Sequence, residues 1–300
     1  MPTFKIRKTS YAKFVKIMQI LVQGNIRMKQ KILAIGDTHG RDDWKEFYKN
    51  SENYDKIIFL GDYVDSFHYS DEHIIKQLEE IIAFKKIFKT KVELLYGNHD
   101  FQYFINLPFR YSCSGYRISY ANKLHDIFKQ NKDLFKIAYQ AGDTLLTHAG
   151  LTYGFWNMLK QHNTLSKAID FNITKKNSYA DVLNACFQAN PLVFWSVSYF
   201  RGGGLTSPSP IWSDIRDFLT PASIKQHETD GKLHLSKEAL LPVNQTIGHM
   251  PVKRHIKLSQ KVDNKKVTYT WIDTGSYEVK DTGNKWINIA EDKPWIELTI

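Results

Sequence analysis

Short, mainly apolar runs that end abruptly in glycine and polar residues recur along the chain. Residues 31–35, 56–60, 92–96 and 144–147 are four such runs, and residues 246–247 are a fifth. Apolar stretches of this length, bounded by glycine, predict buried strands. Each strand would therefore deliver polar side chains from its C-terminal end.

One of the segments between these runs has apolar residues at the spacing of a helix. Across residues 71–88 the apolar side chains recur with the period of one helix face. They are Ile74, Ile75, Leu78, Ile81, Ile82 and Phe84. Strand, polar end, helix and strand form an α/β alternation, which places the polar residues at one edge of a sheet.

The alternation breaks at about residue 152 and resumes after about residue 240. The stretch between contains helical segments and a turn-rich run of Gly, Ser and Pro over residues 202–210. We predict an insertion or cap here, at about 152–240, within one catalytic domain that spans residues 31–300. Further strands are predicted after it at residues 267–272, 286–289 and 295–300.

Positive charge is concentrated at the N-terminus. The chain carries 41 basic and 31 acidic residues, a formal net charge of +10. Residues 1–31 hold eight of the basic residues and no acidic one, which leaves about +2 for the rest of the chain. A basic protein raises the possibility of a nucleic-acid partner, but a nearly neutral catalytic body does not indicate one.

Residues 1–30 are therefore predicted to form a basic N-terminal extension. Its apolar run from Phe14 to Val22 is interrupted by Lys16, so it is too short and too charged to span a membrane. It also lacks the small-residue cleavage site of a secretory signal. Three interpretations of this extension remain: an amphipathic presequence, a basic arm, or residues upstream of a true start at Met28. The third is favoured because the first predicted strand begins shortly after Met28.

The two cysteines, Cys113 and Cys186, form neither a metal-binding pair nor a disulfide framework. This usage is typical of a reducing compartment, so we expect a cytoplasmic protein with no membrane association.

Five blocks of polar residues stand at the predicted strand ends. They are Gly-Asp-Thr-His-Gly at 36–40, Gly-Asp-Tyr-Val-Asp at 61–65, Gly-Asn-His-Asp at 97–100, His-Ala-Gly at 148–150 and Gly-His at 248–249. Carboxylate, amide and imidazole groups that converge from several strands suit a pair of divalent ions such as Mn, Fe, Zn or Mg. Any one block would also suit an ordinary turn, but five in this order favour a shared metal site.

The order and spacing of these blocks resemble the calcineurin-like metallophosphoesterase superfamily. The block at 61–65 resembles its phosphoprotein phosphatase and dinucleoside tetraphosphate hydrolase branch, and the resemblance runs from Lys31 to about Gly275. It implies an α+β fold, a four-layer αββα sandwich of two mixed β-sheets flanked by helices, with a mostly helical insertion.

The resemblance also implies which residues do the chemistry. The first of two divalent metal ions, Mn²⁺ above all, would be held by Asp37, His39 and Asp62, and the second by Asp62, Asn98, His148 and His249. A water or hydroxide bridging the two ions would then attack a phosphate ester. His99 would be the general acid, and Asp65 the carboxylate that orients it.

The sequence departs from the phosphatase branch after Asp65. Ser66 stands where that branch has an arginine that clamps the substrate phosphate. Arg216, which follows a tryptophan in the predicted insertion, is the preferred replacement for substrate binding, and Arg201 and Arg117 are further candidates.

Two features near the C-terminal end also bear on the branch. After His249 come Met250 and Pro251, so the second histidine that several family members use for the first metal is absent. Residues 273–275, Asp-Thr-Gly, resemble the end of bacterial protein phosphatases and dinucleoside tetraphosphate hydrolases, and they suit either a substrate wall or a turn.

Hydrolysis of a phosphomonoester is the leading hypothesis, with a phosphorylated protein, small molecule or nucleotide as the substrate. An alternative is pyrophosphate cleavage in a dinucleoside polyphosphate or a capped RNA. A third reading, from another class, is a non-catalytic scaffold with the same fold. The complete set of candidate metal ligands argues against the scaffold.

Overall fold

The computed structural model describes residues 29–204, 206–226, 233–276, 278–280 and 286–300. Met28 and nearly all of the predicted N-terminal extension, residues 1–30, lie outside the described residues. The division into an extension, a catalytic domain and an insertion stays a prediction.

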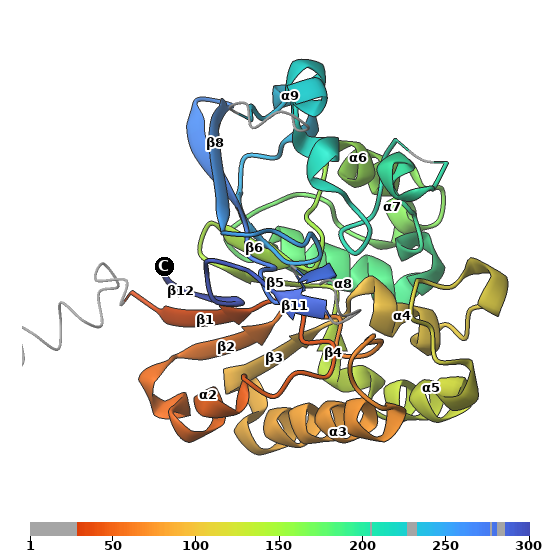
Figure 1. Cartoon of the computed structure of the whole chain (residues 1–300). Coiled ribbons are helices and arrows are strands. Elements are labelled where there is room, and N and C mark those ends of the chain that lie inside the picture. Colours follow the sequence, from red (N-terminus) through yellow and green to blue (C-terminus); the bar gives the residue numbers. More distant parts are fainter. Residues whose placement is uncertain (1–28, 205, 227–232, 277, 281–285) are drawn as a thin grey trace, which may run out of the picture.

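Two five-stranded sheets form the centre of the molecule (Figure 1). The first sheet has the order β12-β1-β2-β3-β4, in which β1 to β4 are parallel and β12 runs antiparallel to β1. Its strands are β1 (Lys31–Ile35), β2 (Lys56–Phe59), β3 (Val92–Leu95), β4 (Phe135–Lys136) and β12 (Trp295–Thr299).

The second sheet has the order β5-β6-β7-β9-β8. Its three inner strands are parallel, and the edge strands β5 and β8 are antiparallel to their neighbours. The strands are β5 (Ala138–Ala141), β6 (Thr144–Thr147), β7 (Asn244–Ile247), β8 (Ile256–Val262) and β9 (Lys265–Trp271). A separate pair is formed by β10 (Glu278–Lys280) and β11 (Trp286–Asn288).

Helices flank the two sheets on their outer sides (Figure 1). The first sheet is covered by α2 (Lys45–Lys49), α3 (Asp71–Phe88) and α5 (Ala121–Gln130), and α4 (Asn98–Phe104) packs against α5. On the other side lie α6 (Tyr153–Gln161), α7 (Leu165–Ala168), α8 (Tyr179–Ala189) and α9 (Pro221–Gln226). Both sheets are mixed, so the predicted αββα sandwich is confirmed.

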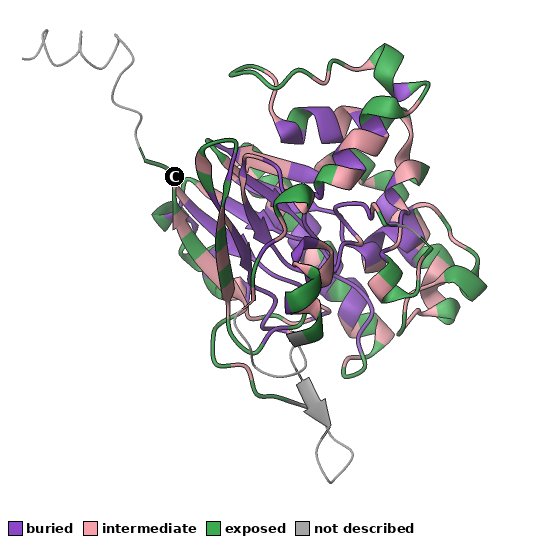
Figure 2. Ribbon diagram, turned by 90° about the horizontal axis from the view of Figure 1, so that it is seen from above, coloured by how far each residue is buried: buried purple, intermediate pink, exposed green. Residues whose placement is uncertain are grey.

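Alternate residues of the inner strands belong to different cores. On β1, Leu33 and Ile35 join the core under the helices, whereas Ile32 and Ala34 join a smaller core with Leu146 of the second sheet. A strand buried on both faces has to be apolar at successive positions, because neighbouring side chains point to opposite faces. The continuous apolar runs in the sequence therefore mark the central strands, which appear as the buried centre of Figure 2.

The predicted helix at 71–88 coincides with α3, and the predicted strands at 31–35, 56–60, 92–96 and 144–147 match β1, β2, β3 and β6 to within one residue. The edge strand β8 was not predicted, because its exposed positions are Lys, Ser and Lys and two of its three apolar side chains are only half-buried.

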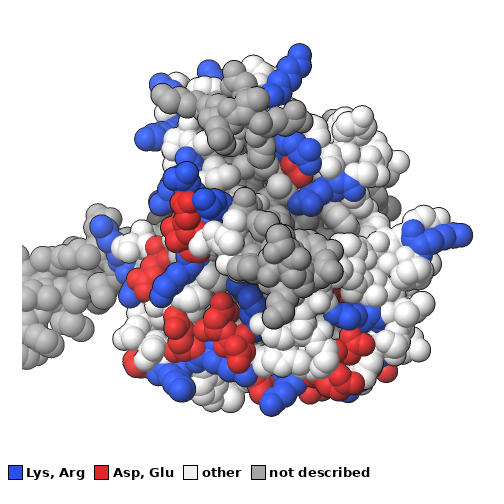
Figure 3. All heavy atoms as spheres, viewed as in Figure 1, with Lys and Arg blue, Asp and Glu red and all other residues white. Residues whose placement is uncertain are grey.

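Charged side chains are mixed on the surface. On the face seen in Figure 3, acidic side chains gather in the lower part, where α2 and α3 lie, while Lys and Arg are spread over the whole face. In the part of the chain that the structure describes, no helix combines the length and the apolar character needed to cross a membrane.

Candidate metal centre

The predicted ligands come together at the C-terminal ends of parallel strands in both sheets. Asp37 and His39 follow β1, Asp62 follows β2, and Asn98 opens α4 directly after β3. His148 and His249 follow β6 and β7 of the second sheet. The site therefore lies where the two sheets present the same edge.

One group of ligand atoms is formed by Asp37, His39 and Asp62, which lie within 4.8 Å of one another. The Nδ1 atom of His39 lies 2.8 Å from the carbonyl oxygen of Val64 and 2.7 Å from that of Asp65. These two acceptors hold the proton on Nδ1, so Nε2, 3.8 Å from a carboxylate oxygen of Asp62, is left with a free lone pair.

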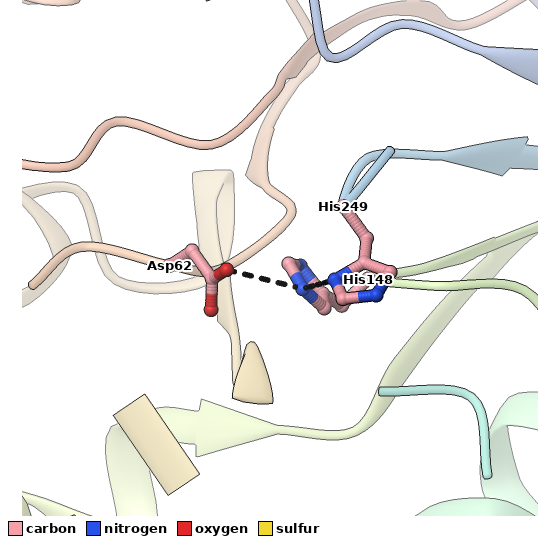
Figure 4. A group of neighbouring side chains, drawn as sticks. All are labelled: Asp62, His148 and His249. Carbon is pink, nitrogen blue, oxygen red and sulfur yellow. Dashed lines mark hydrogen bonds and ion pairs between the residues drawn. The ribbon is translucent and has the colours of Figure 1, made fainter. Parts of the chain in front are cut away.

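A second group is formed by Asp62, His148 and His249, again within 4.8 Å (Figure 4). The Nδ1 atom of His148 lies 3.0 Å from the Leu60 carbonyl oxygen, which leaves Nε2 as an acceptor. That Nε2 lies 3.4 Å from Asp62 Oδ2, 3.0 Å from His249 Nδ1 and 2.9 Å from Asn98 Oδ1. Asn98 thus joins this group through its amide oxygen.

The donor set fits divalent cations. Carboxylate, amide and imidazole acceptors face one another here, and Asp37, Asp62 and His148 are almost completely buried. The ring nitrogens His148 Nε2 and His249 Nδ1 lie 3.0 Å apart, and the Asn98 amide oxygen lies 2.9 Å from the first of them. Buried acceptors without donors are costly unless a cation lies between them. Asp62 belongs to both groups, as a bridging carboxylate would.

The backbone at the site is left-handed at four candidate residues. Positive φ angles occur at His39 (43°), Asp62 (53°), Asp65 (60°) and His249 (63°). Residues other than glycine rarely adopt this conformation, although Asp and His do so more readily than most. Tight turns at the strand ends thus direct these side chains into the site.

Burial and neighbouring charges set the protonation of the carboxylates. Burial raises the pKa of Asp37 well above its ordinary range, and the charges of Asp273 and Asp62 raise it further. Burial acts in the same direction on Asp62, but His148 and His99 hold the pKa of Asp62 below its usual value. Arg201 and His148 reinforce the effect of burial, which lowers the pKa of His249.

His99 and Asp65 form the predicted pair. His99 Nδ1 lies 2.9 Å from Asp65 Oδ2, and the same carboxylate accepts bonds from Gln102 at 2.6 Å and Tyr103 at 2.5 Å. Burial lowers the pKa of His99, but Asp62 and Asp65 outweigh it and raise that pKa to about 9. The His99 ring stands edge-on to His39, with 5.2 Å between ring centroids, and its side chain is 16% exposed.

The candidate arginines lie in two places. Arg201 and Arg216 both bond the buried Asp214 carboxylate, at 3.0 Å and 2.8 Å. Arg201 also lies 2.6 Å from the sulfur of Met250, next to His249. Arg117 instead directs its guanidinium to Asp71, at the start of α3.

Two further residues at the site were not predicted. Asp100 accepts hydrogen bonds from the backbone N–H groups of Asp62, Tyr63 and Gly97, so it joins the loops after β2 and β3. An acidic residue three positions after Gly97 is a recognisable helix-capping pattern and could have indicated this role. Arg41 donates to the carbonyl oxygen of Asp37 at 2.5 Å, and its sequence position alone gives no such indication.

Parts of the chain are similar to known serine/threonine-protein phosphatases. Human serine/threonine-protein phosphatase 5 is 27% identical over 157 residues, which cover 48% of this chain and 30% of that protein. A putative serine/threonine-protein phosphatase of Schizosaccharomyces pombe is 33% identical over 87 residues, 27% of each chain. The chain spans 27–30% of the length of these curated relatives.

A solved structure, a protein serine/threonine phosphatase from Saccharomyces cerevisiae with similarity to human phosphatase PP5, aligns with 98% of this chain and 90% of its own. The TM-score is 0.39 and the sequence identity 15%. The sequence model of the family described as calcineurin-like phosphoesterase matches residues 30–273. With the buried Asp and His groups, this match identifies a metal-binding hydrolase that acts on phosphate esters: the chain belongs to the calcineurin-like phosphoesterase family.

Proposed function

We propose that this metallophosphoesterase is a phosphomonoesterase of the serine/threonine protein phosphatase kind. The observation that carries the proposal is that Asp62 belongs to both groups of candidate ligand atoms. Asp37, His39 and Asp62 would hold one divalent cation, and Asp62, Asn98, His148 and His249 the other. Similarity to protein phosphatases of human and yeast supports the choice of a phosphorylated protein as substrate.

Bound divalent cations, with Mn²⁺ the first choice, would supply Lewis acidity toward the phosphate and acidify water so that a nucleophile exists at neutral pH. The protein orients the candidate ligand side chains before any metal ion binds. Backbone carbonyls fix the tautomers of His39 and His148, and buried surroundings exclude competing water.

His99 is the proposed proton donor to the leaving oxygen. Its Nδ1 is engaged by Asp65, so Nε2 is the atom that can hand over a proton. The ring lies beside His39 and is partly exposed, whereas the proposed second-site ligand His148 is fully buried. The ester oxygen of a substrate arriving from solvent can therefore reach His99, and it leaves as a hydroxyl once it has taken the proton.

Ser66 stands where the phosphatase branch has the arginine that binds the substrate phosphate. We propose that Arg201 binds the phosphate in its place. Arg201 lies against Met250, beside the proposed ligand His249, whose pKa the charge of Arg201 helps to lower. Arg216 is held by Asp214 through Nε and Nη2, and Nη2 also donates to the Phe200 carbonyl oxygen. We therefore assign Arg216 the task of fixing Asp214.

The test is hydrolysis by the purified full-length chain with Mn²⁺, Mg²⁺, Zn²⁺ or Fe²⁺. The substrates are a phosphoserine peptide, p-nitrophenyl phosphate, an aryl phosphodiester, a dinucleoside tetraphosphate and a 5′-capped RNA. We expect the two monoesters to be turned over fastest. Faster turnover of the dinucleoside or capped substrate would replace the proposal with pyrophosphate cleavage.

Two variants assign the roles. Asp62→Asn should lose both bound metal and activity. His99→Ala should keep its metal but lose about 10²- to 10⁴-fold on the phosphoserine peptide, whose alkoxide leaving group needs a proton. The loss on p-nitrophenyl phosphate should be much smaller, because nitrophenolate leaves without one. Equal losses on both substrates would remove His99 from the role of general acid.

A further inference from the structure

Three side chains on one face of α4 converge on the Asp65 carboxylate. His99, Gln102 and Tyr103 stand at positions i, i+3 and i+4 of this helix, so their side chains point to the same side. Tyr103 donates its hydroxyl to Oδ1 of Asp65 at 2.5 Å. Gln102 donates its amide N–H to Oδ2 at 2.6 Å, and His99 Nδ1 lies 2.9 Å from the same oxygen. Separate donors therefore hold both oxygens and prevent the carboxylate from rotating.

The donors Gln102 and Tyr103 are oriented in turn by a segment that follows α4 in the chain, at residues 112–117. The Cys113 N–H donates to Gln102 Oε1 at 2.8 Å, and the Arg117 N–H donates to the Tyr103 hydroxyl oxygen at 2.7 Å. Because the amide oxygen of Gln102 and the hydroxyl oxygen of Tyr103 both accept backbone N–H groups, their own hydrogens are directed to Asp65. The backbone of the segment thus sets which way each donor points.

The same segment packs directly against this network. The ring of Tyr116 stacks on that of Tyr103, with 4.8 Å between centroids and 6° between planes. A Cβ atom on Gly115, whose φ is +78°, would lie 3.6 Å from the Asp65 Cβ. Gln102 and Tyr103 are 0% and 1% exposed. Water is therefore excluded, and a lost donor has no ready substitute.

The ring of His99 depends on Asp65 for its direction. The backbone N–H of His99 donates to Asp62 Oδ1 at 2.9 Å, which fixes the main chain but leaves the ring free to turn. The bond from Nδ1 to Asp65 supplies the second fixed point. We propose that Gln102 and Tyr103 are positioning residues for proton donation, which lock Asp65 so that His99 presents Nε2 to the leaving oxygen. The inference rests on the proposed function, in which His99 is the general acid.

The experiment compares two substrates that differ in their need for a proton. Tyr103→Phe removes the hydroxyl and keeps the ring that stacks on Tyr116. We expect kcat for a phosphoserine peptide to fall about 10- to 100-fold, with KM and bound Mn²⁺ near the wild-type values. Turnover of p-nitrophenyl phosphate should change much less, because nitrophenolate leaves without a proton. Gln102→Met, similar in length but without a donor, should show the same pattern.

Tyr269→Phe is the matched control. Tyr269 lies on β9, is fully buried, and its hydroxyl oxygen accepts the Leu241 N–H at 3.0 Å, as that of Tyr103 accepts the Arg117 N–H. Its loss should lower the thermal midpoint but leave the ratio of the two turnover rates at the wild-type value. Equal losses on both substrates in Tyr103→Phe would show a purely structural role and overturn the inference.

A double variant tests whether the effect passes through His99. In a His99→Ala background, Tyr103→Phe should cost no further activity on the phosphoserine peptide, because its target is already gone. A further loss as large as that in the wild-type background would also overturn the inference, while the effect of His99→Ala alone would stand. Wild-type protein that hydrolyses neither monoester would instead refute the proposed function.

Discussion

Arg201 and Arg216 share one buried carboxylate but differ in what else they reach. Asp214 accepts bonds from both guanidinium groups, and these charges lower the pKa of Asp214 despite its burial. Asp214 therefore holds two guanidinium groups close to each other. Only Arg201 also contacts Met250, beside His249.

Arg201→Ala is expected to raise the KM for a phosphoserine peptide about 10- to 100-fold, the range of a lost hydrogen bond to a charged group. Bound metal should not change, because Arg201 holds no proposed ligand. Steady-state kinetics and metal analysis of the same preparation measure the two effects.

Arg216→Ala should act differently, lowering the thermal midpoint more than it alters KM, because Asp214 then keeps only one partner. Arg117→Ala, which removes the ion pair with Asp71 and leaves the backbone N–H that bonds Tyr103, is the matched control and should leave KM near the wild-type value. A larger KM effect for Arg216→Ala than for Arg201→Ala would reverse the assignment.

The convergence of the candidate ligands was easier to predict from the sequence than the residues that surround them. Asp37, Asp62 and His148 follow apolar runs, and parallel strands necessarily present such residues at one edge. The contact of Arg201 with Met250 joins residues 49 positions apart through irregular segments. No local periodicity encodes a contact of that kind, so the sequence favoured Arg216 and left Arg201 and Arg117 as further candidates.

At the scale of elements, the loops after β2 and β3 pack closely against each other. A Cβ atom added to Gly97, the residue before α4, would lie 2.0 Å from Asp62 Oδ1 and 2.5 Å from the Asp62 backbone nitrogen. The two loops are further tied by Asp100, which accepts the N–H groups of Asp62 and Gly97. The close approach of the loops sets the position of the Asp62 carboxylate.

Gly97→Ala should therefore displace Asp62 and weaken Mn²⁺ binding, with a loss of about 1–3 kcal/mol in the free energy of unfolding, typical of overpacking. Chemical denaturation and Mn²⁺ titration test the two parts. Gly204→Ala is the control, since a Cβ atom there meets nothing within 4 Å. Wild-type metal affinity in Gly97→Ala would show that the loops can separate without harm to the site.

Elements with a clear periodicity of apolar residues could be predicted from the sequence. Elements whose conformation depends on pairing with a neighbouring strand could not. The apolar face of α3 and the doubly buried strand β1 follow directly from sequence spacing. The edge strand β8 has alternating half-buried and exposed positions, so its pairing with β9 supplies most of the reason for its conformation. Tertiary context decides such strands.

At the scale of the whole molecule, the proposed metal centre joins the two sheets. Asp37, Asp62 and Asn98 come from the first sheet and its loops, and His148 and His249 from the second. A hydrogen bond from the His249 N–H to Asp37 connects residues 212 positions apart. Bound ions would therefore link parts of the chain that are remote in sequence.

Metal removal is expected to destabilise the entire fold rather than one loop. At free Mn²⁺ about 100-fold above its dissociation constant, one bound ion stabilises the native state by about 2.7 kcal/mol. Unfolding scans with Mn²⁺ and with EDTA should differ accordingly, in a single cooperative transition. Asp62→Asn should show the same midpoint in both conditions. Identical scans for the wild-type protein would show that metal binding does not stabilise the fold.

The left-handed backbone at His39, Asp62, Asp65 and His249 has a consequence for the stability of the protein with and without metal. Each such residue costs about 1–3 kcal/mol that a glycine would not, and the cost is borne at positions the chemistry requires. In the metal-free protein, glycine or asparagine at these positions would therefore relieve backbone strain. In the metal-bound protein the same substitutions would remove the stabilisation that the ions supply, so the strain is retained only as long as the metal is bound.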